Sequence, residues 1–295
     1  MNIKPSLFYP QSLKLSATFY KAGPWYSRGR ILLFVLLGSL GAVFSLAVAR
    51  SETEVPNTSS TANPVVFVTS VYAPYVINSD GLARGLFPDI VTAAFREMNQ
   101  MVQFQFQPWV RGENSVKLGK AFATFPYLKN AARESEFDFS EPVLFFYPKF
   151  FYNTDRFPHG FEWETLADFR RYRVGGVRGY WYEQSFKQAG IEVQYVTSDR
   201  QNIAMLLVQR IDFTLIDELV GWNLVYETAP DKIDKYAVTS RPQSSDAFHL
   251  MISRNYPNAK LLRLTFDLGL VKIKRNGIYQ QILDQYQVTS EYATP

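Results

Sequence analysis

The 295-residue chain contains no cysteine and only two histidines, His159 and His249. The absence of cysteine excludes a thiol nucleophile, a disulfide, a cysteine metal site and a lipid-modified N-terminal cysteine. Two histidines are too few for a histidine-rich metal cluster, so we expect neither a metal site nor a cofactor. His249 stands in the apolar run FHLMIS, where a packed core histidine is a simpler interpretation than a catalytic group.

Acidic residues are missing from the first 49 positions, which carry five basic residues. Residues 31–49 are an uncharged apolar run that ends in Ala47-Val48-Ala49. A basic flank, an apolar segment and a small-residue cleavage site are typical of a secretory signal peptide over residues 1–49. The run is also long enough for an uncleaved membrane anchor. Under either interpretation the basic side stays in the cytoplasm, and we expect the rest of the chain to be exported to the periplasm.

The formal net charge of +4 belongs largely to this leader. Removing its five basic residues from the 31 in the chain leaves 26 basic against 27 acidic residues, a net charge of −1. A nearly neutral chain argues against a broad phosphate-binding surface, so we expect no nucleic-acid partner.

After a polar linker over residues 50–63, the sequence alternates short β-like runs with amphipathic helical segments. Strands are predicted at residues 65–69, 102–106, 173–177, 193–197 and 213–216. Helices are predicted at residues 88–98, 113–120, 180–190, 258–270 and 277–287, and Ser198 or Asp199 can cap another after residue 199. This alternation indicates an α/β protein with mainly parallel sheets.

Two strand-helix series in succession predict two lobes. We expect lobe 1 to comprise residues 64–150 together with residues 245–295, and lobe 2 to comprise residues 151–244. The last two helices are expected to return to the first lobe.

Six motifs in order give the chain a family resemblance. They are YAPY at residues 72–75, GLFPDI at 85–90, Trp109 with Gly119-Lys120 before TFPYLKNAARESEFDFSEP, the segment from Gly175 to Gly179, LVQRIDFTLIDE at 207–218, and FHLMIS at 248–253. This order resembles the extracellular solute-binding proteins of family 3, the amino-acid-type receptors of ABC importers. The resemblance implies an α/β, two-lobe periplasmic-binding-protein fold, with two crossing hinge segments and a ligand cleft between the lobes.

The resemblance also implies roles for two charged residues. Arg133 matches the arginine that holds the α-carboxylate of an amino-acid ligand, a contact that suits the planar fork of guanidinium. The alternative is a surface arginine paired with Glu134 or Glu136. Asp217 matches the second-lobe carboxylate that receives the α-ammonium, with a helix N-cap or a solvated loop acid as the alternative.

Aromatic residues complete the expected site. Tyr72 matches the aromatic that packs on the ligand side chain, with Tyr75 behind it, and Trp109 is a further candidate. In a chain with 18 tyrosines and 24 phenylalanines, a core position is the alternative for each.

Four positions depart from the family pattern. Asn130 and Tyr180 are ligand-binding candidates where many relatives carry hydroxyl residues, and backbone N–H groups near Gly179 could replace the second of these. Thr69 occupies a position that is acidic in several relatives selecting cationic side chains, which argues against a Lys, Arg or His ligand. Phe122 replaces an acid, which we interpret as a packing change.

Three functions follow from the resemblance. The first is a periplasmic receptor that captures an amino acid or similar zwitterion by lobe closure and delivers it to the membrane subunits of an ABC importer, without turnover. The second is a dehydratase-like enzyme on the same scaffold, although Asp217, Glu218 and His249 show no spacing typical of a proton-transfer pair. The third is a membrane-anchored solute-sensing module.

Overall fold

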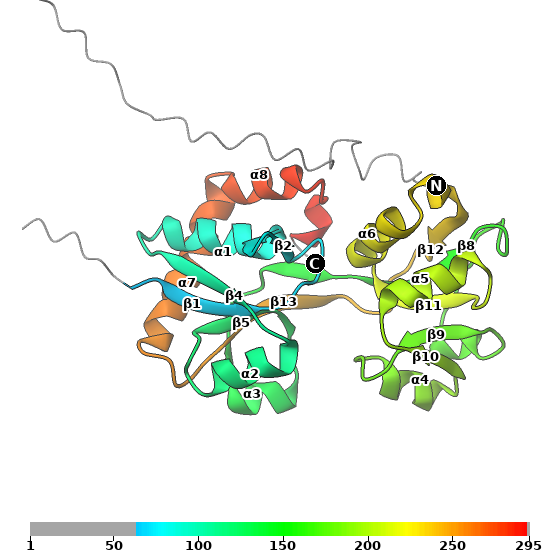
Figure 1. The fold of residues 1–295 in the computed structure, drawn as a ribbon, viewed down its shortest axis with the longest axis horizontal. Coiled ribbons are helices and arrows are strands. Elements are labelled where there is room, and N and C mark those ends of the chain that lie inside the picture. The colour runs from blue at the N-terminus through cyan, green and yellow to red at the C-terminus, as the bar shows by residue number, and fades with distance from the viewer. Residues whose placement is uncertain (1–62, 294–295) are drawn as a thin grey trace, which may run out of the picture. The chain divides into compact units, whose positions relative to one another are not determined.

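The computed structural model describes residues 63–293, which form two α/β lobes, each built around one sheet (Figure 1). The expected leader over residues 1–49, and the expected linker up to residue 62, lie outside the described residues. Within residues 63–293, no helix is long and apolar enough to cross a membrane.

The first lobe contains a mixed six-stranded sheet with the order β4-β1-β5-β13-β6, in which β7 also pairs with β13. Strands β1, β4 and β5 run parallel, and β13 runs antiparallel to β5, β6 and β7. Its strands are β1 (Val65–Thr69), β4 (Val102–Phe106), β5 (Ala123–Leu128), β6 (Asp138–Phe139), β7 (Leu144–Phe146) and β13 (Asp246–Ile252). A separate hairpin pairs β2 (Ile77–Ser79) with β3 (Leu82–Arg84).

Helices cover both faces of this first sheet. Neighbouring residues of β1 point to opposite faces, so that Phe67 packs in the core with α1 while Val68 packs toward α2. The first-lobe helices are α1 (Leu86–Arg96), α2 (Trp109–Lys117), α3 (Ala131–Glu136), α7 (Ala259–Arg275) and α8 (Ile278–Gln285), with the 3-10 turn η4 (Ser290–Tyr292).

The second lobe contains a five-stranded sheet with the order β10-β9-β11-β8-β12. Its strands β9, β10 and β11 are parallel, whereas β8 is antiparallel to both β11 and β12. The strands are β8 (Pro148–Asn153), β9 (Val174–Val177), β10 (Val193–Val196), β11 (Phe213–Asp217) and β12 (Tyr236–Val238).

The second sheet is also buried on two faces. Phe150 lies in a core with Phe169 and Phe186, and its neighbour Phe151 packs on the other face, against Trp222 of α6. The elements of this lobe outside the sheet are α4 (Glu183–Ala189), α5 (Asp199–Leu207), α6 (Glu218–Thr228), η2 (Leu166–Phe169) and η3 (Pro230–Lys235).

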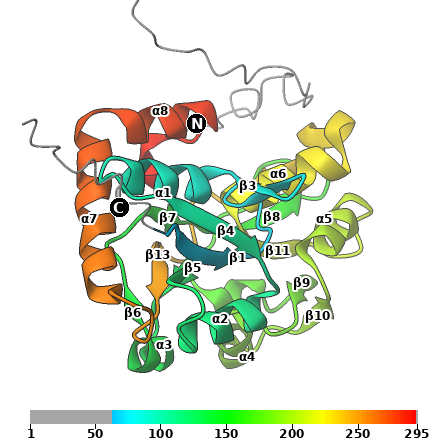
Figure 2. The ribbon, with the colours of Figure 1, turned by 60° about the vertical axis from the view of Figure 1, so that its left-hand side comes forward.

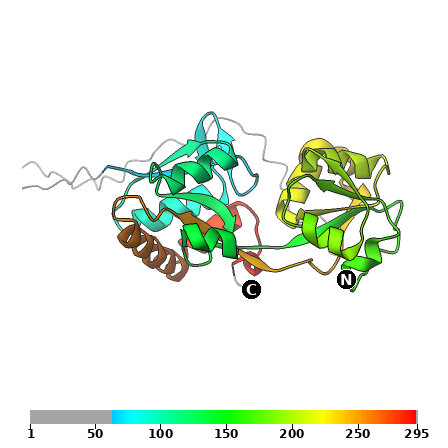
Figure 3. The same ribbon diagram turned by 90° about the horizontal axis from the view of Figure 1, so that it is seen from below.

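Two segments pass between the sheets, one joining β7 to β8 and the other joining β12 to β13 (Figure 3). After the second crossing, α7 and α8 return to the first lobe, where both contact α1 (Figure 2). Gly269 of α7 lies against α1, since an added Cβ there would stand 2.1 Å from the carbonyl oxygen of Ala94.

The predicted elements are present, with helix ends that differ by up to five residues from the predicted bounds, and with one correction. Helix α2 begins at Trp109, four positions before the predicted start, because Pro108 provides an extended N-cap. Helix α7 continues to Arg275, because Ile273 extends its buried face beyond Leu270. The expectation of mainly parallel sheets is wrong for β8 and β13, the first strand after each crossing between the lobes, which run antiparallel to their neighbours.

Candidate functional site

The parallel strands of the first lobe direct three candidate side chains to one edge of the sheet. Strands β1, β4 and β5 end at Thr69, Phe106 and Leu128. The carboxyl ends of parallel strands meet at one edge, which is where open α/β sheets bind ligands. The loops and short helices that follow these ends carry Tyr72, Trp109 and Arg133.

Ring contacts connect these side chains in a continuous line. Tyr75 stacks on Tyr72 with centroids 5.7 Å apart, and Tyr72 meets the edge of Trp109 at 6.4 Å. Trp109 contacts Tyr127 at 5.6 Å, and the guanidinium carbon of Arg133 lies 4.7 Å from the centroid of that ring. Tyr127 was not predicted as a site residue, because it stands within the buried strand TFPYL.

Arg133 occupies the first turn of α3, a six-residue helix. Asn130 caps this helix, and its Oδ1 accepts the Arg133 backbone N–H at 2.9 Å. The guanidinium donates to the Leu128 carbonyl at 3.0 Å, and in residues 63–293 it forms no ion pair. The alternative of pairing with Glu134 or Glu136 is therefore wrong, since Glu136 pairs with Lys117 instead.

The second lobe presents a matching edge. Its parallel strands β9, β10 and β11 end at Val177, Val196 and Asp217, and the residues that follow include Tyr180 and Asp199. Tyr180, Asp199 and Asp217 thus stand at the ends of three different strands, and the common strand direction brings them to the same side of the sheet.

Asp217 is fully buried and accepts hydrogen bonds without a cationic partner in the described chain. Its carboxylate accepts the Tyr75 hydroxyl at 3.1 Å and 3.2 Å, the Tyr147 N–H at 3.3 Å and the Val220 N–H at 3.2 Å. The last contact makes Asp217 the N-cap of α6, as the alternative interpretation predicted. Burial raises the pKa of Asp217 to about 7, although these donors favour its ionised form.

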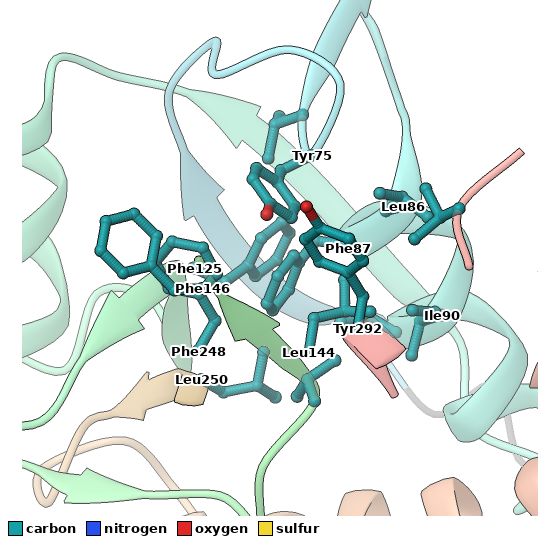
Figure 4. Close-up of a cluster of buried hydrophobic side chains, with 14 of the residues drawn as sticks. Tyr75, Leu86, Phe87, Ile90, Phe125, Leu144, Phe146, Phe248, Leu250 and Tyr292 are labelled. Carbon is teal, nitrogen blue, oxygen red and sulfur yellow. The ribbon is translucent and has the colours of Figure 1, made fainter. Parts of the chain in front are cut away.

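Tyr75 belongs to the first lobe, so its hydroxyl joins the two lobes at Asp217. The ring is fully buried and lies among Phe87, Phe248 and their neighbours (Figure 4). Burial, followed by the charge of Asp217, raises the pKa of Tyr75 well above its usual value. The phenol therefore remains a donor at neutral pH.

Tyr180 and Asp199 form a second polar pair in the second lobe. The Tyr180 hydroxyl donates to Asp199 Oδ2 at 2.9 Å, whereas Asp199 Oδ1 is buried and has no hydrogen-bond partner. Burial raises the pKa of Asp199 to about 6. The backbone donor expected near Gly179 is already engaged, because its N–H donates to Glu183 Oε2 at 2.8 Å.

Electrostatic interactions place groups of both lobes near Tyr72. Burial raises the pKa of the Tyr72 phenol well above its usual value, followed by the charges of Asp217 and then Asp199. Both carboxylates belong to the second lobe, whereas Tyr72 belongs to the first. Side chains of the two lobes meet here, because Tyr75 stacks on Tyr72 and donates its hydroxyl to Asp217.

The other groups considered for acid-base chemistry have structural partners. Glu218 pairs with Lys149 at 2.6 Å and accepts the Tyr292 hydroxyl. His249 is buried, its Nδ1 lies 2.7 Å from the Ser140 carbonyl, and burial lowers its pKa to about 4. Residues 63–293 contain no group of three or more His, Cys, Asp or Glu that could hold a metal ion.

Two family-pattern departures also have structural explanations. Thr69 is buried and donates its hydroxyl to the Phe125 carbonyl at 2.8 Å. Phe122 is fully buried against Phe67 and Phe95, which agrees with a packing change.

Comparison with known families gives one match, the bacterial extracellular solute-binding proteins of family 3, over residues 65–289. No curated protein sequence matches the chain.

Solved structures share the two-lobe periplasmic-binding-protein fold. One is a histidine kinase sensor domain with similarity to periplasmic binding proteins, at 17% identity and TM-score 0.62, covering 76% of this chain and 96% of that one. A second is the arginine-, lysine-, histidine-binding protein ArtJ from Geobacillus stearothermophilus, at 18% identity and TM-score 0.60, covering 76% and 94%. A third is an ancestral amino-acid-binding precursor of cyclohexadienyl dehydratase, at 17% identity and TM-score 0.60, covering 76% and 94%.

Proposed function

The chain belongs to the bacterial extracellular solute-binding proteins of family 3, and from this premise we propose that it is a receptor for an amino acid or similar small zwitterion. The ligand binds between the lobes and is released unchanged.

The observation that carries this proposal is a pair of opposite charges that lack partners of their own. Arg133 in the first lobe has no acidic partner within residues 63–293, and the buried Asp217 in the second lobe has no basic one. A buried carboxylate without a cation is costly, and an exposed face of a guanidinium is suited to bidentate carboxylate binding. A zwitterion supplies both missing charges in one molecule.

The mechanism begins in the first lobe, where the ligand carboxylate binds Arg133 and the side chain packs on Tyr72. The aromatic contacts from Tyr72 through Trp109 to Tyr127 hold the Tyr72 ring and the Arg133 guanidinium in place. The second lobe then closes, and Asp217 accepts the ligand ammonium. Because this contact exists only in the closed state, binding shifts the population toward closure.

The cellular role follows from the same family. We propose that the chain is exported to the periplasm and delivers its ligand to the membrane subunits of an ABC importer. Catalysis is not part of this role, since Glu218 and His249 are both held by structural contacts. The alternative is a sensor role, because one of the similar structures is a histidine kinase sensor domain.

The decisive experiment is a thermal-shift screen of the full chain, purified in mild detergent, against the amino acids and related zwitterions. A ligand that binds only the folded state raises the unfolding midpoint. We expect a shift with at least one zwitterion, lost in Arg133→Ala and strongly weakened in Arg133→Lys, because lysine lacks the bidentate fork.

The matched control is Arg96→Ala, an exposed arginine at the end of α1. It should unfold and bind like the parent chain. Normal ligand binding by Arg133→Ala would show that the carboxylate is held elsewhere. Conversion of the ligand into a product would replace the receptor role with an enzymatic one.

A further inference from the structure

Asp199 is a buried acidic residue to which the proposed binding of a zwitterion by Arg133 and Asp217 gives no role. The residue is 7% exposed and occupies the first turn of α5, which follows the carboxyl end of β10. One carboxylate oxygen accepts the Tyr180 hydroxyl, and the other, Oδ1, is buried without a hydrogen-bond partner. Buried polar atoms are nearly always satisfied, so an unpartnered carboxylate oxygen at a strand edge points to a ligand group.

No basic side chain of the second lobe supplies that partner. Arg200, the next residue in the sequence, pairs with Glu227 and donates to Thr228, and Arg178, which follows β9, lies over the ring of Tyr195. Asp199 takes part in none of the ion pairs formed within residues 63–293. Its charge therefore has no counter-ion within residues 63–293.

The balance of charge at the site indicates the kind of molecule. Around Tyr72 and Tyr127, the interacting side chains include one guanidinium, Arg133, and three carboxylates, Glu113, Asp199 and Asp217. A ligand with one carboxylate and one ammonium leaves this excess of negative charge uncompensated. A second cationic group on the ligand reduces it, and such a group is stabilised most strongly where water is excluded.

The proposed function already gives the α-carboxylate and the α-ammonium of the ligand their partners, so the part of the ligand left for Asp199 is its distal end. Arg133 and Asp217 engage its α-carboxylate and α-ammonium, and Asp199 acts on the same Tyr72 phenol from a separate loop. We propose that Asp199, held by Tyr180, binds a second cationic group, so that the ligand is a basic amino acid such as lysine, ornithine or arginine. This inference rests on the proposed function and deepens it by naming the ligand class.

The assignment reverses the expectation drawn from Thr69. Thr69 donates its hydroxyl to the Phe125 carbonyl and has no charge to offer. The acid that selects a cationic side chain comes instead from the opposite lobe, through α5. The ligand cation would then contribute to closure as well as to selectivity.

The test compares ligands that differ in charge but little in shape, on the full chain in mild detergent. Isothermal titration calorimetry measures the affinities of L-arginine against L-citrulline and of L-lysine against L-norleucine. A hydrogen-bonded charge pair predicts that one basic ligand binds at least about ten-fold more tightly than its neutral counterpart. Asp199→Asn, which keeps an acceptor for Tyr180, should remove about ten-fold of that preference while retaining the neutral ligand.

Asp231→Asn, in an exposed turn of the same lobe, is the matched control and should leave the preference unchanged. Equal binding of basic and neutral ligands, with Arg133→Ala still abolishing both, overturns the assignment of Asp199 but keeps the receptor. An unchanged preference in Asp199→Asn overturns it as well, and would place only an internal water at Oδ1. Failure of every amino acid to bind overturns the receptor and this inference together.

Discussion

At the scale of the residue, Asp217 couples ligand binding to the stability of the empty protein. Its pKa rises from 3.8 to about 7 on folding, mainly through burial, so the folded state holds the proton more tightly than the unfolded chain. The contribution of this group to the free energy of unfolding is therefore largest below pH 3.8, and it is lost as the pH rises through about 7. The shift corresponds to about 4 kcal/mol at most.

We expect Asp217→Asn to remove this pH dependence, because the amide does not ionise. The free energy of unfolding of the parent chain, minus that of Asp217→Asn, should decrease by up to about 4 kcal/mol between pH 4 and pH 8. Urea denaturation of both chains at the two pH values measures this difference in the free energy of unfolding. A constant difference would mean that Asp217 ionises as easily in the folded protein as in the unfolded chain.

His249 acts in the opposite direction, which is why the comparison uses a difference between two chains. Burial lowers its pKa from 6.5 to about 4, so its contribution is present above pH 6.5 and is lost as the pH falls toward 4. The parent chain and Asp217→Asn share this term, and it cancels in the subtraction.

At the scale of the element, α3 is a short helix whose residues are mostly exposed, and it positions the residue on which the proposed binding depends. None of its residues is fully buried, so its capping contact has a large share in its stability. Asn130→Ala should cost roughly 0.5–2 kcal/mol locally and weaken ligand binding by allowing Arg133 to move. Asn130→Ser, which restores a capping oxygen, should bind like the parent chain.

Calorimetric titration of both variants with the ligand found in the thermal-shift screen measures this effect. Circular dichroism should show an unchanged fold, since α3 contributes only six residues. Equal affinity in all three chains would show that the Arg133 guanidinium is held by Leu128 and Tyr127 alone.

Single elements differ in how well the sequence predicts them. Strand β4 has its predicted bounds, because VQFQF alternates apolar and polar residues throughout. Arg133 and Asp217 were predicted as site residues because each stands in a motif with a recognisable order, and their role stays a prediction. Tyr127 was missed, since nothing local distinguishes it from the other buried aromatics of β5, and Asp199 was interpreted only as a helix cap. Their significance depends on contacts between segments that the pattern of one segment does not contain.

At the scale of the whole molecule, the hydrogen bond from Tyr75 to Asp217 links residues 142 positions apart and joins the two lobes. In the ligand-free chain, the Tyr75 hydroxyl donates to the same carboxylate that the proposed ligand ammonium would contact. Asp217 keeps two backbone donors, from Tyr147 and Val220, when the hydroxyl is removed. The bond therefore stabilises the approach of the lobes before ligand arrives.

Tyr75→Phe tests this link, because it removes only the hydroxyl and keeps the ring contacts with Phe87 and Phe248. We expect the ligand-free variant to populate open states more, which small-angle scattering would detect as a larger radius of gyration. Ligand affinity should fall by up to about ten-fold, because binding must then also supply the closing free energy that this hydrogen bond to a charged group contributes in the parent chain. Saturating ligand should bring the radius back to that of the parent, because the ammonium then occupies Asp217.

Tyr279→Phe is the matched control, since it removes a buried tyrosine hydroxyl that donates to the Val143 carbonyl within the first lobe. It should lower stability without changing the radius of gyration of the ligand-free chain. If both variants keep the parent radius and affinity, the Tyr75 hydroxyl does not contribute to closure. In that case the proposed ligand would be the main link between Arg133 in one lobe and Asp217 in the other, and closure would depend on ligand concentration alone.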